Sequence, residues 1–339
     1  MLRLDAYRWR SRRVSRRFAG RLVQVQNLPR NYLPDLAQAR GLVRTGNFDA
    51  LELLYPSVPD TLSQLIRTAF IPKPGCRFVV ADYSAIEARV IAWLAGETST
   101  LQAFREGKDL YCETASRMFG VPVEKHGVNS ELRQKGKIAT LSCGYQGGPG
   151  ALKAMGALRM GLDESELQPI VDSWRAANPH VVQLWAAVNT AAIGAIETCD
   201  PQCVGPLRFI VESGILFIEL PSGRRLAYVK PRLGENRFGG TSILHDGINT
   251  GRWCQLETYG GKLVENIVQA VARDLLTYGM HQVEAAGHQI VMHVHDEIVV
   301  ETSDVTVDEI CGLMASMPSW AEGLPLDADG YECSFYMKD

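Results

Sequence analysis

Three consecutive titratable side chains interrupt a largely apolar stretch between residues 291 and 301. The segment reads VMHVHDEIVVE and places His295, Asp296 and Glu297 between two β-type runs. This pattern predicts a hairpin over 290–301 with the acidic pair at its turn. Two carboxylates between buried strands repel each other unless a cation or a proton compensates. The hairpin therefore predicts a cation site; the alternative is an exposed turn in which charges are well solvated.

A further carboxylate follows a second apolar run. Residues 76–82, CRFVVAD, predict a buried strand that ends at Asp82, and residues 84–96 predict the helix that follows it. A carboxylate held at the end of a rigid strand is well placed to bind a hard cation. The alternative is that Asp82 caps the following helix.

A helical stripe is formed by four side chains at steps of four residues, namely Arg133, Lys137, Leu141 and Tyr145. Four residues advance a helix by about 400°, so the stripe drifts slowly along one face. Ser130 is the expected N-cap of this helix. Two cations followed by an apolar residue and an aromatic residue match a triphosphate joined to a sugar and a base. The alternative is a solvated basic face that runs into a buried one.

The order of these three clusters is more specific than any one of them. If Asp82 and Asp296 converge from different strands of one sheet, they could hold two metal ions. Two metals roughly 3.5–4 Å apart stabilise both the attacking and the leaving oxygen of an in-line phosphoryl displacement. The basic stripe would then hold the departing phosphates.

The elements that must position these residues alternate in type along the chain. Residues 98–200 are mostly helical in pattern, residues 204–260 predict hairpins, and residues 261–286 return to an amphipathic helix before the acidic hairpin. This order predicts an α+β sheet domain interrupted by a mainly helical one.

Composition limits the function classes only loosely. The chain has 339 residues, of which 46% are hydrophobic and 22% charged, with a net charge of −3. The first 21 residues carry eight arginines and one aspartate, which suits phosphate binding, a basic tail or a presequence. No apolar run of about 18 residues occurs, so no membrane partner is expected. The scattered cysteines indicate a reducing, cytoplasmic compartment.

The three clusters resemble the motifs of family A DNA polymerases, the bacterial DNA polymerase I group, and most closely its phage members. DYSAIEAR (82–89) is similar to motif A, RQKGKIATLSCGYQG (133–147) to motif B, and HVHDEIVVE (293–301) to motif C. Weaker matches are GRLVQVQNLP (20–29) and FREGKDLY (104–111). The resemblance implies a template-directed DNA polymerase core that adds dNTPs to a primer 3′-hydroxyl, in phage DNA replication.

The same resemblance implies an architecture. A right-hand palm with an antiparallel sheet would occupy 21–97 and 261–339. A helical fingers domain would occupy 98–260, with a hairpin-rich insertion around 204–260, and residues 1–20 would form a basic N-terminal segment. Thumb and exonuclease domains are expected to be absent, which implies a separate polypeptide that supplies them or a truncated gene. Primer binding by the chain alone would then be weak and sensitive to salt.

The resemblance also implies roles for individual residues. Asp82, Asp296 and the Tyr83 carbonyl would bind two Mg²⁺ ions, Glu297 would assist near the primer end, and Lys137 would protonate the pyrophosphate. The implied dNTP-binding residues are Arg133, Lys137, Leu141, Tyr145, Glu87 and Tyr111. The implied DNA-binding residues are Arg21, Gln269 and His295. Glu87, together with Tyr145, would exclude a 2′-hydroxyl.

Three substitutions depart from the family pattern. Leu141 stands where the family has Phe or Tyr, Tyr111 where bacterial enzymes have a phosphate-contacting His, and Gln146 where motif B ends in Gly. The sequence leaves three other functions to be weighed against this one. A single-subunit RNA polymerase is disfavoured by Glu87, and a metal-dependent phosphohydrolase does not explain the basic stripe. A catalytically impaired DNA-binding remnant is the alternative from another class.

Overall fold

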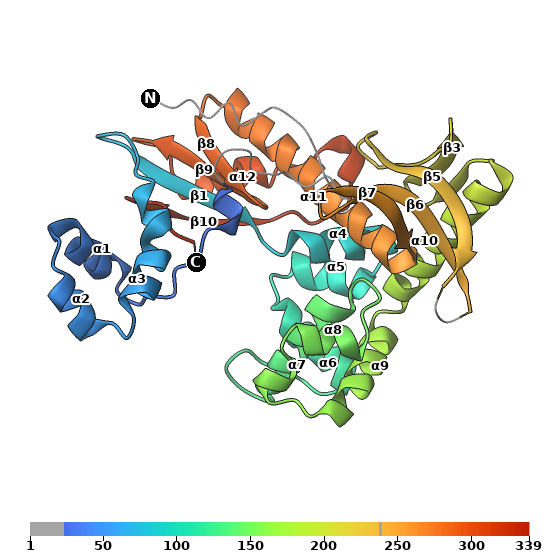
Figure 1. Cartoon of the computed structure of the whole chain (residues 1–339), viewed down its shortest axis with the longest axis horizontal. Coiled ribbons are helices and arrows are strands. Elements are labelled where there is room, and N and C mark those ends of the chain that lie inside the picture. The colour runs from blue at the N-terminus through green and yellow to red at the C-terminus, as the bar shows by residue number, and fades with distance from the viewer. Residues whose placement is uncertain (1–23, 237–238, 339) are drawn as a thin grey trace.

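The computed structural model describes residues 24–236 and 239–338, and its centre is a four-stranded antiparallel sheet. Its strands are β1 (Arg77–Tyr83), β8 (Ile290–Val294), β9 (Glu297–Thr302) and β10 (Ala328–Cys333), in the order β10-β1-β9-β8. The apolar run of β1 occupies an inner position, with β9 and β10 on either side (Figure 1).

Because side chains alternate along β1, the two faces of this sheet pack against different parts of the molecule. Val79, Ala81 and Tyr83 pack into the main hydrophobic core, and Phe78 and Val80 pack into a smaller cluster on the other face. Three helices join the main-core side: α4 (Ile86–Ala95), α11 (Gly260–Ala285) and α12 (Val307–Met314). Asp82 shares its side of β1 with the smaller cluster, so it is set apart from the apolar core.

A helical lobe interrupts the sheet unit between α4 and α11 (Figure 1). Its helices are α5 (Thr98–Arg105), α6 (Leu110–Phe119), α7 (Leu132–Cys143), α8 (Pro149–Ala154), α9 (Leu167–Ala177) and α10 (Pro179–Thr198). Ser130 does not cap α7, so that prediction is wrong: the helix begins after Glu131, which makes no side-chain capping bond. The helix also ends at Cys143, which leaves Tyr145 just beyond it.

A second antiparallel sheet follows the lobe, with its strands in sequence order. They are β2 (Gln202–Val204), β3 (Leu207–Glu212), β4 (Ile215–Glu219), β5 (Arg225–Glu235), β6 (Thr241–Asn249) and β7 (Arg252–Thr258). The sheet is tied to α11 because Arg224 Nε donates to Asp274 Oδ1 at 2.6 Å and Asn266 Nδ2 donates to the Tyr228 hydroxyl at 3.0 Å. One hydrophobic core therefore runs from the central sheet through α10 and α11 into this second sheet.

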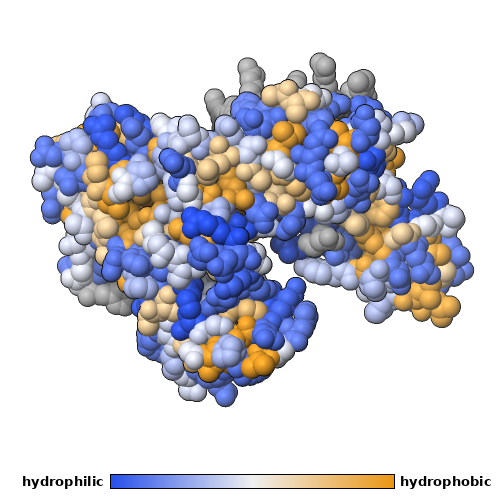
Figure 2. All heavy atoms as spheres, turned by 180° about the vertical axis from the view of Figure 1, so that it is seen from behind, coloured by the Kyte–Doolittle hydropathy of each residue, from blue (hydrophilic) through white to orange (hydrophobic). Residues whose placement is uncertain are grey.

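A small helical lobe precedes β1 and has no counterpart in the sequence predictions. It consists of α1 (Leu36–Thr45), α2 (Phe48–Leu54) and α3 (Val58–Leu65) and lies at the opposite end of the molecule from the second sheet (Figure 1). Apolar side chains lie on its surface, among them Leu53, which is 85% exposed (Figure 2).

Short 3-10 helices complete the described part of the chain, at Val25–Asn27, Ile66–Ala69, Leu158–Met160, Glu164–Glu166 and Ser319–Ala321. Within residues 24–236 and 239–338, no helix combines the length and the apolar character that crossing a membrane would require.

Candidate active site

The pairing of β1 with β9 brings Asp82 next to the acidic hairpin. Asp82 is the register partner of Glu297, and the Tyr83 amide donates to the Asp296 carbonyl at 3.3 Å. The turn that presents Asp296 is sharp because His295 adopts a φ of +58°, in the left-handed region. The two segments therefore meet at one end of the sheet, although they lie far apart in the sequence.

A cavity of about 390 Å³ opens beside this meeting point. Asp82 and Asp296 both line it. Its other lining residues are Arg30, Ile86, Glu87, Gln269, Ala272, Arg273, His295 and Lys338. Glu87, Gln269 and His295, to which the resemblance also gave roles, thus line the same cavity as the two aspartates. Glu297 does not line it, but its carboxylate contacts Lys338, which does.

The protonation of Asp82 reflects its surroundings. Burial, followed by the negative charge of Asp296, raises the pKa of Asp82 to about 7, while the nearby Lys338 ammonium opposes this rise. One of its oxygens, Oδ1, is buried and accepts no hydrogen bond within the described residues. A buried carboxylate oxygen without a donor is unusual, and a divalent cation would satisfy it.

The donor set fits Mg²⁺ bound partly by the protein. Within the described residues, no group of three or more His, Cys, Asp or Glu side chains gathers as metal ligands. Mg²⁺ does not require such a cage, since it is usually held by one or two carboxylates together with substrate phosphates and water. Asp82 and Asp296 are the two aspartates that line the cavity, and Glu87, which also lines it, already accepts a hydrogen bond from Tyr145. The Tyr83 side chain points away from the two aspartates, because its buried hydroxyl donates to the Leu275 and Met314 carbonyls.

Glu297 differs from the two aspartates because its carboxylate already has partners. It is 2% exposed, its Oε1 accepts the Tyr336 hydroxyl at 2.7 Å, and its Oε2 lies 3.6 Å from Lys338 Nζ. Arg67 in turn donates to the Tyr336 hydroxyl at 3.3 Å. Burial raises the pKa of Glu297, although Lys338 and Tyr336 oppose this. Neither Tyr336 nor Lys338 carried a signal in the sequence, because neither belongs to a recognisable motif.

Glu87 connects the acidic cavity to the helical lobe. Its Oε2 accepts a hydrogen bond from the Tyr145 hydroxyl at 2.8 Å. Glu87 also lines a second, smaller cavity of about 120 Å³, together with Leu141 and Tyr145. Leu141 is 49% exposed and is therefore accessible to a ligand from this side.

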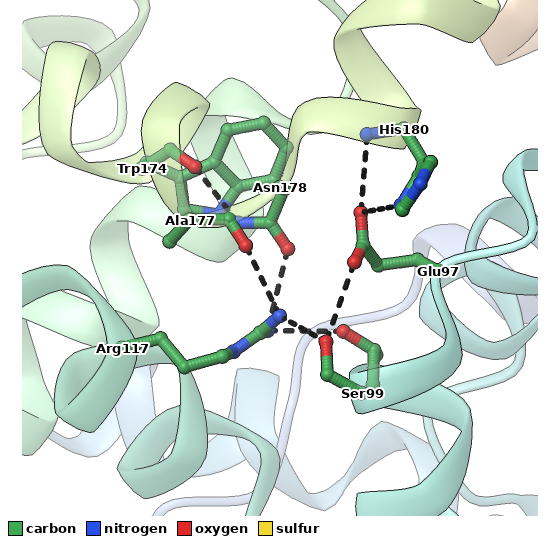
Figure 3. A network of polar contacts seen from close by, with 8 residues as sticks. Glu97, Ser99, Arg117, Trp174, Ala177, Asn178 and His180 are labelled. Carbon is green, nitrogen blue, oxygen red and sulfur yellow. Dashed lines mark hydrogen bonds and ion pairs between the residues drawn. The ribbon is translucent and has the colours of Figure 1, made fainter.

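A partly buried polar network contributes to the lining of this smaller cavity (Figure 3). Arg117 of α6 donates to Ser99 Oγ at 2.8 Å, to Thr100 Oγ1 at 2.9 Å and to the Ala177 carbonyl at 3.1 Å. Glu97 accepts the His180 amide at 3.3 Å. These bonds join α5, α6, α9 and α10, so the helical lobe has a fixed interior behind Tyr145.

The basic stripe lies on α7, where Arg133 and Lys137 face Tyr111 of α6. The Arg133 guanidinium carbon lies 5.3 Å from the centre of the Tyr111 ring, and Lys137 Nζ lies 5.8 Å from it. Arg133 also pairs with Asp109, which the sequence had not indicated. Neither cation is among the residues that line the two cavities. Arg21 lies outside the described residues.

Gln146 shows why the end of this motif favours glycine. Its φ is +67°, a left-handed conformation that a side chain rarely adopts. Its side-chain Oε1 accepts the Gly261 amide at 3.1 Å, at the first turn of α11. The glutamine therefore keeps the backbone turn and adds a bond between the helical lobe and α11.

The fold is α+β, with a pair of aspartates at one end of an antiparallel sheet. The structure is similar to that of the POL domain of Pol1 from M. smegmatis in complex with DNA primer-template and dNTP, with a TM-score of 0.59 and 18% identity, over 95% of this chain and 46% of that one. Residues 44–195 match the model of DNA polymerase family A.

Sequence relatives lead to the same family. The DNA polymerase of Bacillus phage SP02 is 53% identical over 328 residues, which cover 95% of this chain and 51% of the relative. The thermostable DNA polymerase I of Thermus aquaticus is 29% identical over 257 residues, which cover 74% of this chain and 26% of the relative. The region that matches DNA polymerase family A is residues 44–195, and the chain spans about half the length of the phage relative.

Proposed function

We propose that this chain is the catalytic core of a template-directed DNA polymerase that extends a primer 3′-hydroxyl with dNTPs, using two Mg²⁺ ions. The observation that carries the proposal is the meeting of Asp82 and Asp296 at one cavity, where Asp82 has a buried oxygen that accepts no hydrogen bond within residues 24–236 and 239–338. The primer-template and dNTP in the similar Pol1 structure, and the names of the relatives, support DNA and dNTPs as ligands.

The proposed mechanism assigns each group a task. Mg²⁺, when bound, would lower the pKa of the primer 3′-hydroxyl and stabilise charge on the leaving pyrophosphate. Asp82 and Asp296 would hold the metal ions, with the Tyr83 carbonyl as a further ligand. Arg133 and Lys137 would bind the triphosphate, and Lys137 would donate a proton to the pyrophosphate. Glu297, bound to Tyr336 and Lys338, would assist near the primer end.

The substrate would be selected beside the aspartates. Glu87 is held by Tyr145 at the edge of the acidic cavity, where it would leave no room for a ribose 2′-hydroxyl. This arrangement favours a DNA polymerase over a single-subunit RNA polymerase. Gln269 and His295 line the same cavity and would contact the primer-template, while Leu141 would pack against the incoming nucleotide.

The remaining features of the proposal follow the family. The central sheet with α4, α11 and α12 would be the palm, over 21–97 and 261–339, and the lobe from α5 to α10 would be the fingers, with residues 204–260 as an inserted sheet. We propose that the enzyme acts in phage DNA replication in the bacterial cytoplasm.

Primer extension with Mg²⁺ tests the proposal. Asp296→Asn should reduce the rate by at least about a hundredfold, as for the loss of a central electrostatic group. Asp329→Asn is the matched control. Asp329 lies on β10, directly opposite Asp82 in the sheet, but it does not line the cavity. It should retain most of the activity. Equal rates for the wild type and Asp296→Asn would reject the proposed function.

A further inference from the structure

The helices that carry the basic stripe and its neighbours approach each other closely. Gly136 lies between Arg133 and Lys137 in sequence, and a Cβ at this position would lie 2.4 Å from the backbone oxygen of Tyr111 in α6. It would also lie 3.0 Å from the Ala115 Cβ. Glycine is therefore needed because the two backbones touch. The contact fixes the first turns of α6 beneath the cationic face of α7.

The two carboxylate oxygens of Asp109 bind two different groups, the N-terminus of α6 and the Arg133 guanidinium. Its Oδ1 accepts the amides of Tyr111 and Cys112, both at 3.0 Å, and so caps the N-terminus of α6. Its Oδ2 accepts Arg133 Nε at 3.1 Å and Nη2 at 2.8 Å. Burial alone would raise the pKa of Asp109, but the hydrogen bonds from Arg133 and Cys112 lower it below its ordinary value. The capping carboxylate is thus also the anchor of the guanidinium.

This anchoring orients the remaining donors of Arg133. A guanidinium has five N–H donors in a planar fork. Asp109 occupies the edge formed by Nε and Nη2, and the Cys112 thiol also interacts with the guanidinium. Because the group is planar, fixing one edge fixes the direction of the other. An anion approaching the Nη1 edge would meet donors that are already aligned.

The Tyr111 ring supports both cations. Arg133 and Lys137 lie within 6 Å of the ring centre, the range in which the face of an aromatic ring attracts a cation. Two like charges would otherwise separate in the absence of an anion. A shared ring keeps them on one side of α7, and this effect depends on the ring and not on the hydroxyl.

We propose that Asp109 and Tyr111 are positioning residues that preset Arg133 and Lys137 for the triphosphate of the incoming nucleotide, with Tyr111 acting through its ring. Neither residue needs to contact the phosphates itself. This inference deepens the proposed function and rests on it. It also replaces the direct binding of dNTP that the resemblance implied for Tyr111.

The first test separates orientation from helix capping. Asp109→Asn keeps a side chain that caps helices well but removes the charge that anchors Arg133. Glu166→Gln is the matched control, because it removes the ion pair with Lys135 on the same helix. Binding of inorganic tripolyphosphate is measured by calorimetry, and KM and kcat for dNTP are measured by primer extension. Unfolding temperatures verify that both variants are folded.

Asp109→Asn should weaken tripolyphosphate binding and raise KM for dNTP by roughly tenfold, as for one charge-assisted interaction, with kcat within about twofold. Glu166→Gln should leave all of these unchanged. Binding by Asp109→Asn equal to or tighter than that of the wild type would overturn the role of Asp109. Arg133→Ala distinguishes a failure of the positioning role of Asp109 from a failure of the proposed binding of the triphosphate by Arg133. If it binds tripolyphosphate as well as the wild type does, the assignment of Arg133 in the proposed function fails instead.

The second test asks which part of Tyr111 acts. Tyr111→Phe keeps the ring and should change KM by less than about twofold, whereas Tyr111→Leu should raise KM severalfold, as expected for the loss of a cation–π contact. Restoration by the conservative variant is the signature of a ring effect. An equal loss in both variants would assign the role to the hydroxyl, and no loss in either would remove Tyr111 from the site. Either result overturns the inference.

Discussion

Tyr145 donates a hydrogen bond of 2.8 Å to Glu87, and this bond links the segment just beyond α7 to the first turn of α4. Glu87 stands where the acidic cavity and the smaller apolar cavity adjoin. The bond therefore fixes a carboxylate at the edge of the proposed nucleotide site. If the helical lobe moves relative to the sheet, this contact must move with it.

The first prediction concerns sugar selection. Glu87→Ala should raise ribonucleotide incorporation relative to deoxynucleotides by about 10- to 100-fold, because removing a packed side chain admits one additional hydroxyl. Tyr145→Phe should have a smaller effect, since the carboxylate remains and only its anchor is lost. The measurement is the ratio of kcat/KM for dNTP and rNTP on one template. An unchanged ratio in Glu87→Ala would show that discrimination lies elsewhere.

The second prediction is a pH dependence of stability in the metal-free protein. Burial and the charge of Asp296 raise the pKa of Asp82 to about 7, above the ordinary value of 3.8. Between these two values the folded state holds a proton that the unfolded state has released. The free energy of unfolding should therefore fall as pH rises from about 4 to 7, and this contribution should be constant above 7.

Urea unfolding in the presence of a chelator measures this slope, and Asp82→Asn supplies its control. The variant cannot lose the proton, so it should show a shallower slope than the wild type. Some slope should remain, because burial also raises the pKa of Glu297. Identical slopes for the two proteins would mean that Asp82 does not titrate in this range.

The third prediction concerns the support of Glu297. Tyr336→Phe removes the hydroxyl that donates to Glu297 at 2.7 Å and accepts from Arg67 at 3.3 Å. A buried carboxylate would then lack one donor, which should cost about 1–3 kcal/mol in the free energy of unfolding. Tyr32→Phe is the control, because Tyr32 is 75% exposed and its loss of a hydroxyl should cost little. Equal costs in the two variants would argue against a structural role for the Tyr336 hydroxyl.

The parts of the molecule that local patterns encode could be predicted from the sequence. The apolar run before Asp82 forms an inner strand, the VMHVHDEIVVE segment forms a hairpin, and the amphipathic stretch predicted at 261–286 forms α11. These elements depend on the alternation or helical spacing of apolar residues over a few turns. That Asp82 and Asp296 converge was a hypothesis, which rested on their places at a strand end and at a hairpin turn.

The parts that depend on distant partners were not predicted. Asp109 reads as a helix cap, and only the close approach of α6 and α7 reveals its pairing with Arg133. Lys338 lies in no motif, yet the fold places its ammonium near Glu297. The α1–α3 lobe contains short helices with much of their apolar surface exposed, so their pattern carries little of the usual core signal. Register and packing between separate elements decide these features.

The last prediction tests the contact that positions the basic stripe. Gly136→Ala places a Cβ 2.4 Å from the Tyr111 backbone oxygen, which cannot rotate away as a flexible side chain would. The helices must separate, so the variant should lose about 1–3 kcal/mol of unfolding free energy, as for an overpacked core, and should bind dNTP more weakly. Gly41→Ala is the matched control, since no atom lies within 4 Å of the added Cβ in α1. There, alanine should stabilise the helix by up to about 1 kcal/mol, because glycine is the poorer helix former. Urea unfolding and dNTP titration measure both variants, and equal stability of Gly136→Ala and the wild type would contradict the close contact between α6 and α7.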